Sequence, residues 1–442
     1  MYRTKIKELI QWKLDSEKKP LIFYGARQVG KTYLIQEFAK SEYRQMVYIN
    51  FERAKEIQNI FLQDLDPKRL ITAFEFYAGF KITPEDTLIV LDEIQAAKQG
   101  ITSLKYFCEE TPEYQIIAAG SLLGINLHED ESFPVGKVDM LTLYPMSFYE
   151  FLLAMGEENG LAKILSEQHF DMMNVFNEKF KEYLKYYFYV GGMPEAVKTF
   201  AENRDWKKTR NIQNKILKNY RGDFSKHAPK EIVPRINMVW DSISSQLSKE
   251  NKKFIYGVLK EGARAKEFEL AIQWLTDAGL LHKVFAVTKA GTPLVSYQDF
   301  SAFKLYHNDL GLLGAMSKLK IKTLVDGDTI FEEFKGSLTE QYTFQQLLLN
   351  EELTINYFPF DNGRYELDFL IENEEGELIP IEVKAGENLD APSFKIFCQR
   401  EHPKTAIKTS LTNYKEESWM INVPLYAINV LIGNSDDNPQ RS

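Results

Sequence analysis

The chain has 442 residues with a formal net charge of -9, and 44% of its residues are hydrophobic. This length can hold about two to four domains, and the acidic balance argues against a protein that coats nucleic acid without specificity. The two cysteines, Cys108 and Cys398, lie far apart in the sequence and form no CxxC or CxxH pattern. We therefore expect neither a disulfide framework nor a zinc site. The low cysteine content favours a cytoplasmic location. We also expect no signal peptide and no membrane span.

Residues 1–145 alternate short apolar runs with amphipathic segments. The apolar runs predict strands at 20–24, 46–51, 87–93, 114–119 and 137–143, and the amphipathic segments predict helices at 6–14, 32–41 and 57–77. The run at 87–93 is continuously apolar before its two final acids, which is typical of a parallel strand covered on both faces. We therefore predict an α/β domain with a parallel sheet over residues 1–145.

The first strand leads directly into a glycine-rich loop. Its residues fit GxxxxGK[ST]: Gly25, Ala26, Arg27, Gln28, Val29, Gly30, Lys31 and Thr32. Such a loop, between a strand and a helix, turns backbone N–H groups and a helix N-terminus toward phosphates. Lys31 is expected to reach the β- and γ-phosphates, and Thr32 to bind a magnesium ion. The sequence thus predicts ATP and Mg²⁺ as ligands.

Two acids end the strand at 87–93. We expect Asp92 to join the magnesium shell and Glu93 to polarise the attacking water. Adjacent acids can also form a solvated turn, but their place after an apolar strand favours a functional role. Ser121 follows the next strand, where it would either sense the γ-phosphate or act as a helix N-cap.

Residues 146–223 are predicted to form a helical lid and a basic linker helix. Helical periodicity is present at 147–155, 162–168, 176–187 and 201–220, and Pro194 begins a further helix. Between Ala201 and Leu270 there are 16 Lys and Arg against 9 Asp and Glu. A solvated helical face is the commoner cause of such a run, and a nucleic-acid footprint is the alternative.

Residues 224–298 have the element order of a winged helix. Helices are expected at 232–247, 253–260 and 265–277, and strands at 280–287 and 294–295. The third helix carries Glu267, Glu269 and Asp277, which disfavour contact with phosphates. We therefore favour a structural or protein-contacting role. The preceding basic segment could still contact the phosphate backbone of a nucleic acid. The candidate residues for such a face are Lys207, Lys208, Arg210, Lys215, Lys218 and Arg221.

Residues 299–442 contain helical patterns at 310–319 and 329–349 and a hairpin signal between strands 365–371 and 377–384. With the turn centred on Glu375, Asp368 lies opposite Glu382, and Glu366 lies opposite Lys384, all on one face. Together with Glu340 from an upstream helix, these carboxylates and the lysine suit a divalent-metal site for phosphodiester cleavage. The alternative is a solvent-exposed hairpin face with cross-strand ion pairs.

Several motifs together resemble a family of prokaryotic AAA-type ATPases whose C-terminal domain, of unknown function, is related to PD-(D/E)xK nucleases. The motifs are the loop at 25–32, the segments 91–95, 120–121 and 143–151, Gly191 to Glu195, and Pro380 to Gly386. The resemblance implies an ATPase core joined to a nuclease-like domain. The family pattern has Gly-Arg before the fifth strand, whereas this chain has Gly136-Lys137 and no arginine between Arg69 and Arg204. Lys137 could replace the arginine, the C-terminal half of the chain or another subunit could supply an arginine, or turnover could be slow.

Three functions are compatible with these patterns. The first is a slow Mg-dependent ATPase that acts as a switch for a nuclease-like domain, with Glu93, Lys31 and Lys384 as catalytic residues and DNA or RNA as target. The second is a nucleotide-dependent scaffold whose nuclease-like domain is inactive and contacts protein or nucleic acid. The third is an interaction module with a structural nucleotide, which the intact Asp92 and Glu93 disfavour. A protein partner or a homo-oligomer is compatible with each.

Overall fold

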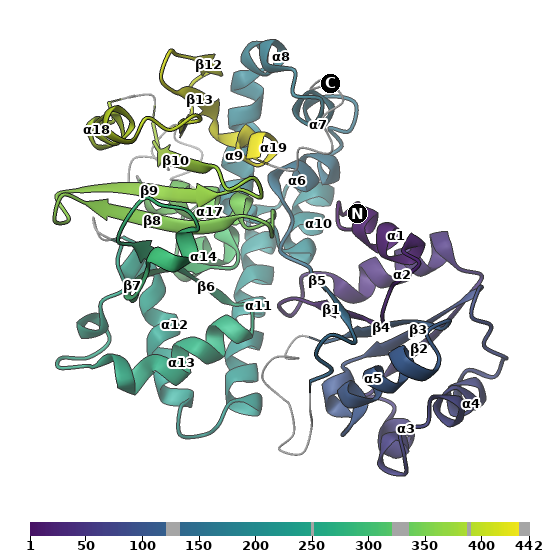
Figure 1. Ribbon diagram of the computed structural model, residues 1–442. Helices are drawn as coiled ribbons and strands as arrows, with labels where there is room; N and C mark the ends of the chain where they lie inside the picture. Colours follow the sequence, from purple (N-terminus) through teal and green to yellow (C-terminus); the bar gives the residue numbers. More distant parts are fainter. Residues whose placement is uncertain (121–132, 249–251, 321–335, 387–389, 433–442) are drawn as a thin grey trace. The chain divides into compact units, whose positions relative to one another are not determined.

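The computed structural model of the chain describes residues 1–120, 133–248, 252–320, 336–386 and 390–432 (Figure 1). Backbone contacts divide it into two compact units. The first consists of residues 2–144 and 277–280, and the second of residue 1 and residues 145–276 and 281–442. None of the described helices has the length and apolar content needed to cross a membrane. The sequence predicted four domains, at residues 1–145, 146–223, 224–298 and 299–442. This finer division stays a prediction.

The N-terminal unit is built on a five-stranded parallel sheet with the order β2-β3-β4-β1-β5. The strands are β1 (Leu21–Tyr24), β2 (Gln45–Asn50), β3 (Thr87–Asp92), β4 (Gln115–Ala119) and β5 (Asp139–Thr142). Every residue of β3 is buried, as expected for a strand covered on both faces. The predicted parallel α/β fold is thus confirmed, and each strand lies within about two residues of its expected position.

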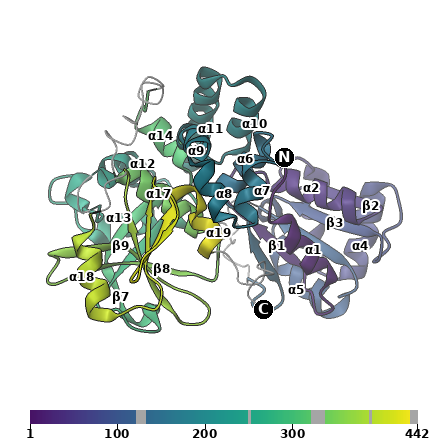
Figure 2. The same cartoon turned by 90° about the horizontal axis from the view of Figure 1, so that it is seen from above.

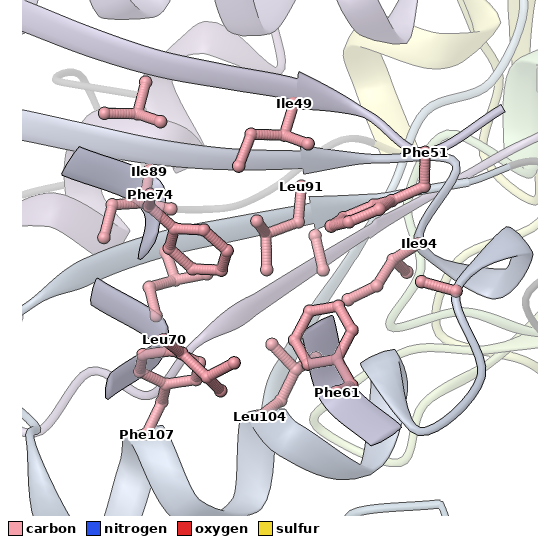
Figure 3. Close-up of a cluster of buried hydrophobic side chains, with 14 of the residues drawn as sticks. Ile49, Phe51, Phe61, Leu70, Phe74, Ile89, Leu91, Ile94, Leu104 and Phe107 are labelled. Atoms are coloured by element: carbon pink, nitrogen blue, oxygen red, sulfur yellow. The ribbon is translucent and has the colours of Figure 1, made fainter. Parts of the chain in front are cut away.

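Helices cover both faces of this sheet (Figure 1). They are α1 (Ile6–Leu14), α2 (Lys31–Glu42), α3 (Lys55–Gln58), α4 (Pro67–Ala78) and α5 (Gly100–Glu110), with short 3₁₀ turns η1 (Asn59–Leu62) and η2 (Ile94–Ala96). Figure 3 shows the apolar core on one face, where Ile49, Ile89 and Leu91 of the strands meet Phe74 of α4 and Phe107 of α5. This core fixes the ends of β2 and β3, where the polar site residues begin.

The second unit begins with a group of helices. They are α6 (Phe148–Ala154), α7 (Leu161–Ser166), α8 (Phe170–Val175), α9 (Asn177–Val190), α10 (Pro194–Asn203), α11 (Trp206–His227), α12 (Val233–Leu247), η3 (Tyr256–Val258) and α13 (Ala265–Asp277). Ser147 and Glu150 form a capping box that starts α6. Figures 1 and 2 show α9, α11 and α14 (Leu310–Met316) packed side by side.

An eight-stranded mixed sheet forms the rest of this unit, with the order β12-β13-β11-β10-β9-β8-β6-β7. Its strands are β6 (Leu281–Val287), β7 (Gln298–His307), β8 (Thr354–Phe360), β9 (Tyr365–Glu372), β10 (Leu378–Val383), β11 (Ile407–Ser410), β12 (Lys415–Glu416) and β13 (Ile421–Pro424). The remaining elements are η4 (Leu294–Tyr297), α17 (Ser337–Leu347), α18 (Pro392–Glu401), η5 (Leu425–Ala427) and α19 (Ile428–Ile432). Phe394 and Phe397 of α18 pack on Phe358 and Leu367 of the sheet.

The winged helix expected over residues 224–298 is not confirmed. The β6–β7 hairpin continues the large sheet through the parallel pairing of β6 with β8. The helix expected at 253–260 is only the turn η3, because Phe254 donates its backbone N–H to Phe303 and Ile255 donates to Gln246. The strand expected at 294–295 is a 3₁₀ turn, and Leu294 donates its N–H to the Glu372 carboxylate instead.

Helix α17 is buried over its whole length although several of its side chains are polar. Gln341 accepts from the backbone N–H of His307 at 2.9 Å and donates to the carbonyl of the same residue at 2.7 Å. Gln345 accepts from Leu310 N, and Gln346 from Phe148 N. These amides satisfy buried backbone groups of separate segments, so α17 joins the helices to the sheet and fixes Glu340 in the interior.

Candidate functional site

The glycine-rich loop has the backbone that its sequence predicts. Gly25 has φ 144° and Gly30 has φ 97°, while Gln28 between them has φ 68°. A Cβ atom on Gly25 would lie 2.4 Å from the carbonyl oxygen of Leu143, so only glycine fits there. The loop ends at the first turn of α2, where backbone N–H groups and the helix dipole favour an anion.

Lys31 lies inside this loop. Its ammonium donates to the carbonyl oxygens of Gly25 at 2.6 Å and Ala26 at 2.9 Å. Burial lowers the pKa of Lys31 to about 8, although the nearby Glu93 and Asp92 raise it. A buried ammonium beside backbone donors is suited to receive phosphate oxygens.

Asp92 is the meeting point of three elements. Its Oδ2 accepts from Thr32 Oγ1 at 3.4 Å, from Asn50 Nδ2 at 3.2 Å and from the Tyr48 hydroxyl. Its Oδ1 accepts from the backbone N–H of Glu93. A carboxylate facing a threonine hydroxyl at the carboxyl end of a parallel sheet is an oxygen donor pair that fits Mg²⁺.

Glu93 occupies a left-handed backbone conformation with φ 50°, which is unusual for a residue other than glycine. Gln95 Nε2 donates to its Oε2 at 2.5 Å. Burial raises the pKa of Glu93, and Asp92 adds to this rise, while the Gln95 hydrogen bond lowers it. A raised pKa suits a carboxylate that accepts a proton from water. The strained backbone at this position is typical of functional sites.

Two other predicted positions have different outcomes. Ser121 lies outside the described residues. Lys137, one of the alternatives considered for the missing arginine, forms an ion pair at 2.9 Å with Glu109 at the end of α5. In the described structure Lys137 is therefore engaged with a carboxylate of its own unit.

Several residues around the loop were not expected from the sequence. Arg3 is buried and donates to the carbonyl oxygen of Val29 at 2.8 Å and to that of Tyr144 at 2.5 Å. Tyr48 and Asn50 bind Asp92, and Gln95 binds Glu93. A signal existed for Asn50, since a polar residue at the end of a strand beside β3 should lie near Asp92. Arg3 had none, because its partners are remote in sequence.

The predicted carboxylates of the second unit also come together. The β9–β10 register pairs Phe369 with Ile381, and its continuation sets Asp368 opposite Glu382 as expected. Glu340 interacts electrostatically with both Asp368 and Glu382, but cations engage its own carboxylate. Its carboxylate pairs with Lys252, with Lys304 at 3.1 Å, and with the Tyr306 hydroxyl. Burial would raise the pKa of Glu340, but the two lysines lower it to about 2.

Lys304 is a fully buried cation on β7 that the sequence did not single out. It also pairs with Glu366 at 2.7 Å. Burial lowers its pKa, but Glu340, Glu366 and Asp368 together raise it above the ordinary value. The sequence predicted that this acidic face would either lie at the solvent surface or bind a metal ion. In the structure the buried Lys304 neutralises part of its charge.

The remaining acids are less fully paired. Asp368 accepts from the backbone N–H of Val383 at 2.8 Å, and Lys384 pairs with Glu382 Oε1 at 2.7 Å. The second oxygen of Glu382 is buried with no partner among the described residues. Burial and Asp368 raise the pKa of Glu382 to about 7. No group of three acidic, histidine or cysteine ligands in the described part of the chain has the arrangement of a metal site.

The basic segment is the helix α11, and its cations differ in their surroundings. Arg210 is directed inward, 4.1 Å from the ring centre of Tyr189, and donates to the carbonyl oxygen of Gly311. Arg221 pairs with Asp241 of α12. Lys207, Lys208 and Lys218 are exposed. Arg210 is therefore a structural residue and not part of a face that could contact the nucleic-acid backbone.

Comparison with protein families agrees with the N-terminal site. Residues 17–152 match the AAA domain, and residues 181–323 and 335–428 match two domains of unknown function, DUF8612 and DUF4143. The N-terminal unit accordingly contains an AAA-type P-loop domain. The predicted relation of the C-terminal part to nucleases is not confirmed by these matches. A search of the curated proteins found no match.

The chain also matches solved structures, at low sequence identity and with TM-scores below 0.5. A Walker-type ATPase of Pyrococcus abyssi is 14% identical, covering 71% of this chain and 94% of its own, with a TM-score of 0.44. DnaA of Aquifex aeolicus, solved with AMPPCP, is 15% identical over 62% of this chain and 86% of its own, with a TM-score of 0.27. A signal-transduction ATPase of Pyrococcus horikoshii is 11% identical with a TM-score of 0.28; this chain covers 79% of its own length and 49% of that protein.

Proposed function

We propose that the chain hydrolyses ATP in a magnesium-dependent reaction. The observation that carries this proposal is the convergence of Lys31, Thr32, Asp92 and Glu93 at the carboxyl ends of β1 and β3. Thr32 and Asp92 would hold Mg²⁺, which when bound neutralises phosphate charge. Lys31 would bind the phosphates and Glu93 would take the proton of the attacking water.

In this reaction the water oxygen bonds to the γ-phosphorus as the bond to the ADP oxygen breaks. The water proton passes to the Glu93 carboxylate and then to solvent, so the products are ADP, phosphate and a proton. Gln95 orients the carboxylate through its 2.5 Å hydrogen bond. Tyr48 and Asn50 hold Asp92 so that the adjacent Glu93 backbone is fixed.

The test compares wild type with Glu93→Gln, Lys31→Ala and the control Lys40→Ala on the exposed side of α2. Glu93→Gln should lower the turnover number about 10²- to 10⁴-fold while ATP binding persists. Lys31→Ala should abolish binding, and Lys40→Ala should match wild type. Mg-ATP at 100 times its dissociation constant should stabilise wild type by about 2.7 kcal/mol. A wild-type protein without magnesium-dependent turnover would refute the proposed hydrolysis, and one that also shows no thermal shift would refute the nucleotide site.

A second proposal is that the ATPase acts as a slow switch for a divalent-cation site at Asp368 and Glu382 that binds or cleaves nucleic acid. The observation that favours it is the unpartnered buried oxygen of Glu382, beside Asp368 and Lys384. Glu340 supports this site less well, because lysines engage it. The alternative role is a scaffold without cleavage.

Cleavage should be assayed on plasmid and single-stranded substrates in Mg²⁺ or Mn²⁺, with and without ATP. We expect Glu382→Gln to lose cleavage and Glu375→Gln, in the exposed hairpin turn, to retain it. Cleavage that survives Glu382→Gln would indicate a contaminating nuclease. No cleavage in wild type would favour the scaffold. ATP-independent cleavage would contradict the switch.

A further inference from the structure

The ATPase site requires a cation for the charge that develops on the transferred phosphate. A guanidinium serves best, because it is permanently charged and binds two phosphate oxygens at once. The sequence has no arginine between Arg69 and Arg204, and Lys137 lacks the planar two-point donor of a guanidinium. One arginine, however, lies within the phosphate-binding loop itself. It is Arg27, two residues after Gly25 and four before Lys31.

Arg27 lies at the same edge of the sheet as the reacting groups. Its guanidinium Nη2 is 3.6 Å from Oε1 of Glu52. Glu52 follows β2 by two residues, and the last residue of β2, Asn50, pairs in register with Asp92 and donates to its carboxylate. The pair of Arg27 and Glu52 therefore lies beside the Asp92 and Glu93 end of β3.

Electrostatic coupling agrees with this location. The positive charge of Arg27 lowers the pKa of Lys31, which burial already lowers, and it also lowers the pKa of Glu93 against the effect of burial. Arg27 is thus near both the phosphate-binding ammonium and the expected base. Two cations close together beside backbone donors are stabilised when a polyanion binds between them.

We propose that the Arg27 guanidinium transfers from Glu52 to the terminal phosphate of bound ATP and stabilises the charge that develops there. The same chain would then supply the arginine that is missing before the fifth strand, where Gly136-Lys137 replaces Gly-Arg. Arg27 forms and breaks no covalent bond, since the proton of the attacking water goes to Glu93. Its side chain is 23% exposed and that of Glu52 is 39% exposed, so their ion pair is weak enough to exchange for a phosphate.

This inference rests on the proposed ATP hydrolysis, and the same assay separates the two. Turnover of the wild type tests the proposed hydrolysis. The ratio of the kcat of Arg27→Ala to that of wild type tests the role of Arg27. We expect Arg27→Ala to lower kcat on the order of 10²- to 10³-fold, with less than about tenfold change in ATP affinity. Arg27→Lys should restore only part of this loss, because lysine lacks the planar bidentate donor. Glu52→Gln should keep at least the wild-type kcat. Arg44→Ala is the matched control, since Arg44 pairs with Asp86 on the surface of the same unit.

A binding measurement provides a readout without turnover. ADP with aluminium fluoride, which mimics the transferring phosphate, should bind wild type more tightly than Arg27→Ala by the same factor as the loss in kcat, while ADP alone binds both equally. An Arg27→Ala protein with kcat within about threefold of wild type would overturn the proposal. An equal loss of kcat and of thermal stability in Arg27→Ala and Glu52→Gln would also overturn it, because the ion pair would then only shape the loop. An inactive wild type would refute the proposed hydrolysis itself.

Discussion

The guanidinium of Arg3 donates to the carbonyl oxygen of Val29, 2.8 Å away, and thereby ties the start of the chain to the phosphate-binding loop. The same side chain donates to Tyr144. Arg3 is almost fully buried, so these charge-assisted bonds are shielded from water. One side chain thus restrains the loop just before Gly30.

We predict that Arg3→Ala destabilises the protein and weakens nucleotide binding together. The free energy of unfolding should fall by about 1.5–3 kcal/mol, since hydrogen bonds to a buried charged group are lost. Denaturant unfolding and titration with a fluorescent ATP analogue would measure both effects. Lys40→Ala, which removes an exposed ion pair of α2, should change neither. Unchanged ATP affinity in Arg3→Ala would mean that the loop does not depend on this anchor.

A second prediction concerns Gly25. Gly25→Ala would place a Cβ atom 2.4 Å from the Leu143 carbonyl at φ 144°, so the loop or the end of β5 must shift. Gly79→Ala is the matched control, because Gly79 also has positive φ but has no atom within 4 Å of its Cβ position. The control should lose about 1–2 kcal/mol of stability and keep ATP binding. Gly25→Ala should lose ATP binding, and normal binding there would show that the close approach to Leu143 is dispensable.

The third prediction tests the buried cations around Glu340. Glu340→Gln removes the carboxylate shared by Lys252 and the fully buried Lys304. Breaking such a pair leaves an uncompensated charge and should cost about 3–5 kcal/mol, reduced here because Glu366 still pairs with Lys304. Urea unfolding would measure the loss against Glu375→Gln in the exposed turn. A change below that of the control would indicate that Lys304 is neutral in the fold.

The sequence predicted those parts of the molecule that depend on local pattern. The loop at 25–32, the strand that ends in Asp92 and Glu93, and the register of Asp368 with Glu382 each follow from spacing within one or two adjacent elements. The anchors could not be predicted. Arg3 reaches partners 26 and 141 residues away, and Lys304 meets Glu340 across 36 residues. Such contacts are set by tertiary packing, which leaves no periodic signal.

The strand β7 was missed for the same reason. Its buried face includes Lys304 and His307, residue types that normally indicate solvent exposure. Only the carboxylates and amides of α17 make that burial favourable, through Glu340 to Lys304 and Gln341 to the His307 backbone. The helix itself was expected, but the role of its polar side chains as an internal frame was not.

The fourth prediction concerns Asp309, whose carboxylate accepts from the backbone N–H of Gly192 at 2.5 Å and of Leu312 at 2.9 Å. Burial raises the pKa of Asp309 from 3.8 to about 6, against the effect of these bonds. The folded state therefore binds the proton more tightly than the unfolded state, and the contribution of this group to stability falls as pH rises from about 4 to 6. The Asp309→Asn variant lacks this loss.

Asp309→Asn should be less stable than wild type at pH 4, and the difference should shrink as pH rises to 6, by about 1.4 kcal/mol per pH unit at most. His307 nearby has its pKa lowered by burial to about 3 and titrates with the opposite sign, but it is present in both proteins and largely cancels in the difference. Urea unfolding at half-unit steps of pH would measure the slope. A difference independent of pH would mean that Asp309 ionises in the fold as easily as in the unfolded chain, and that its two N–H bonds fully offset its burial.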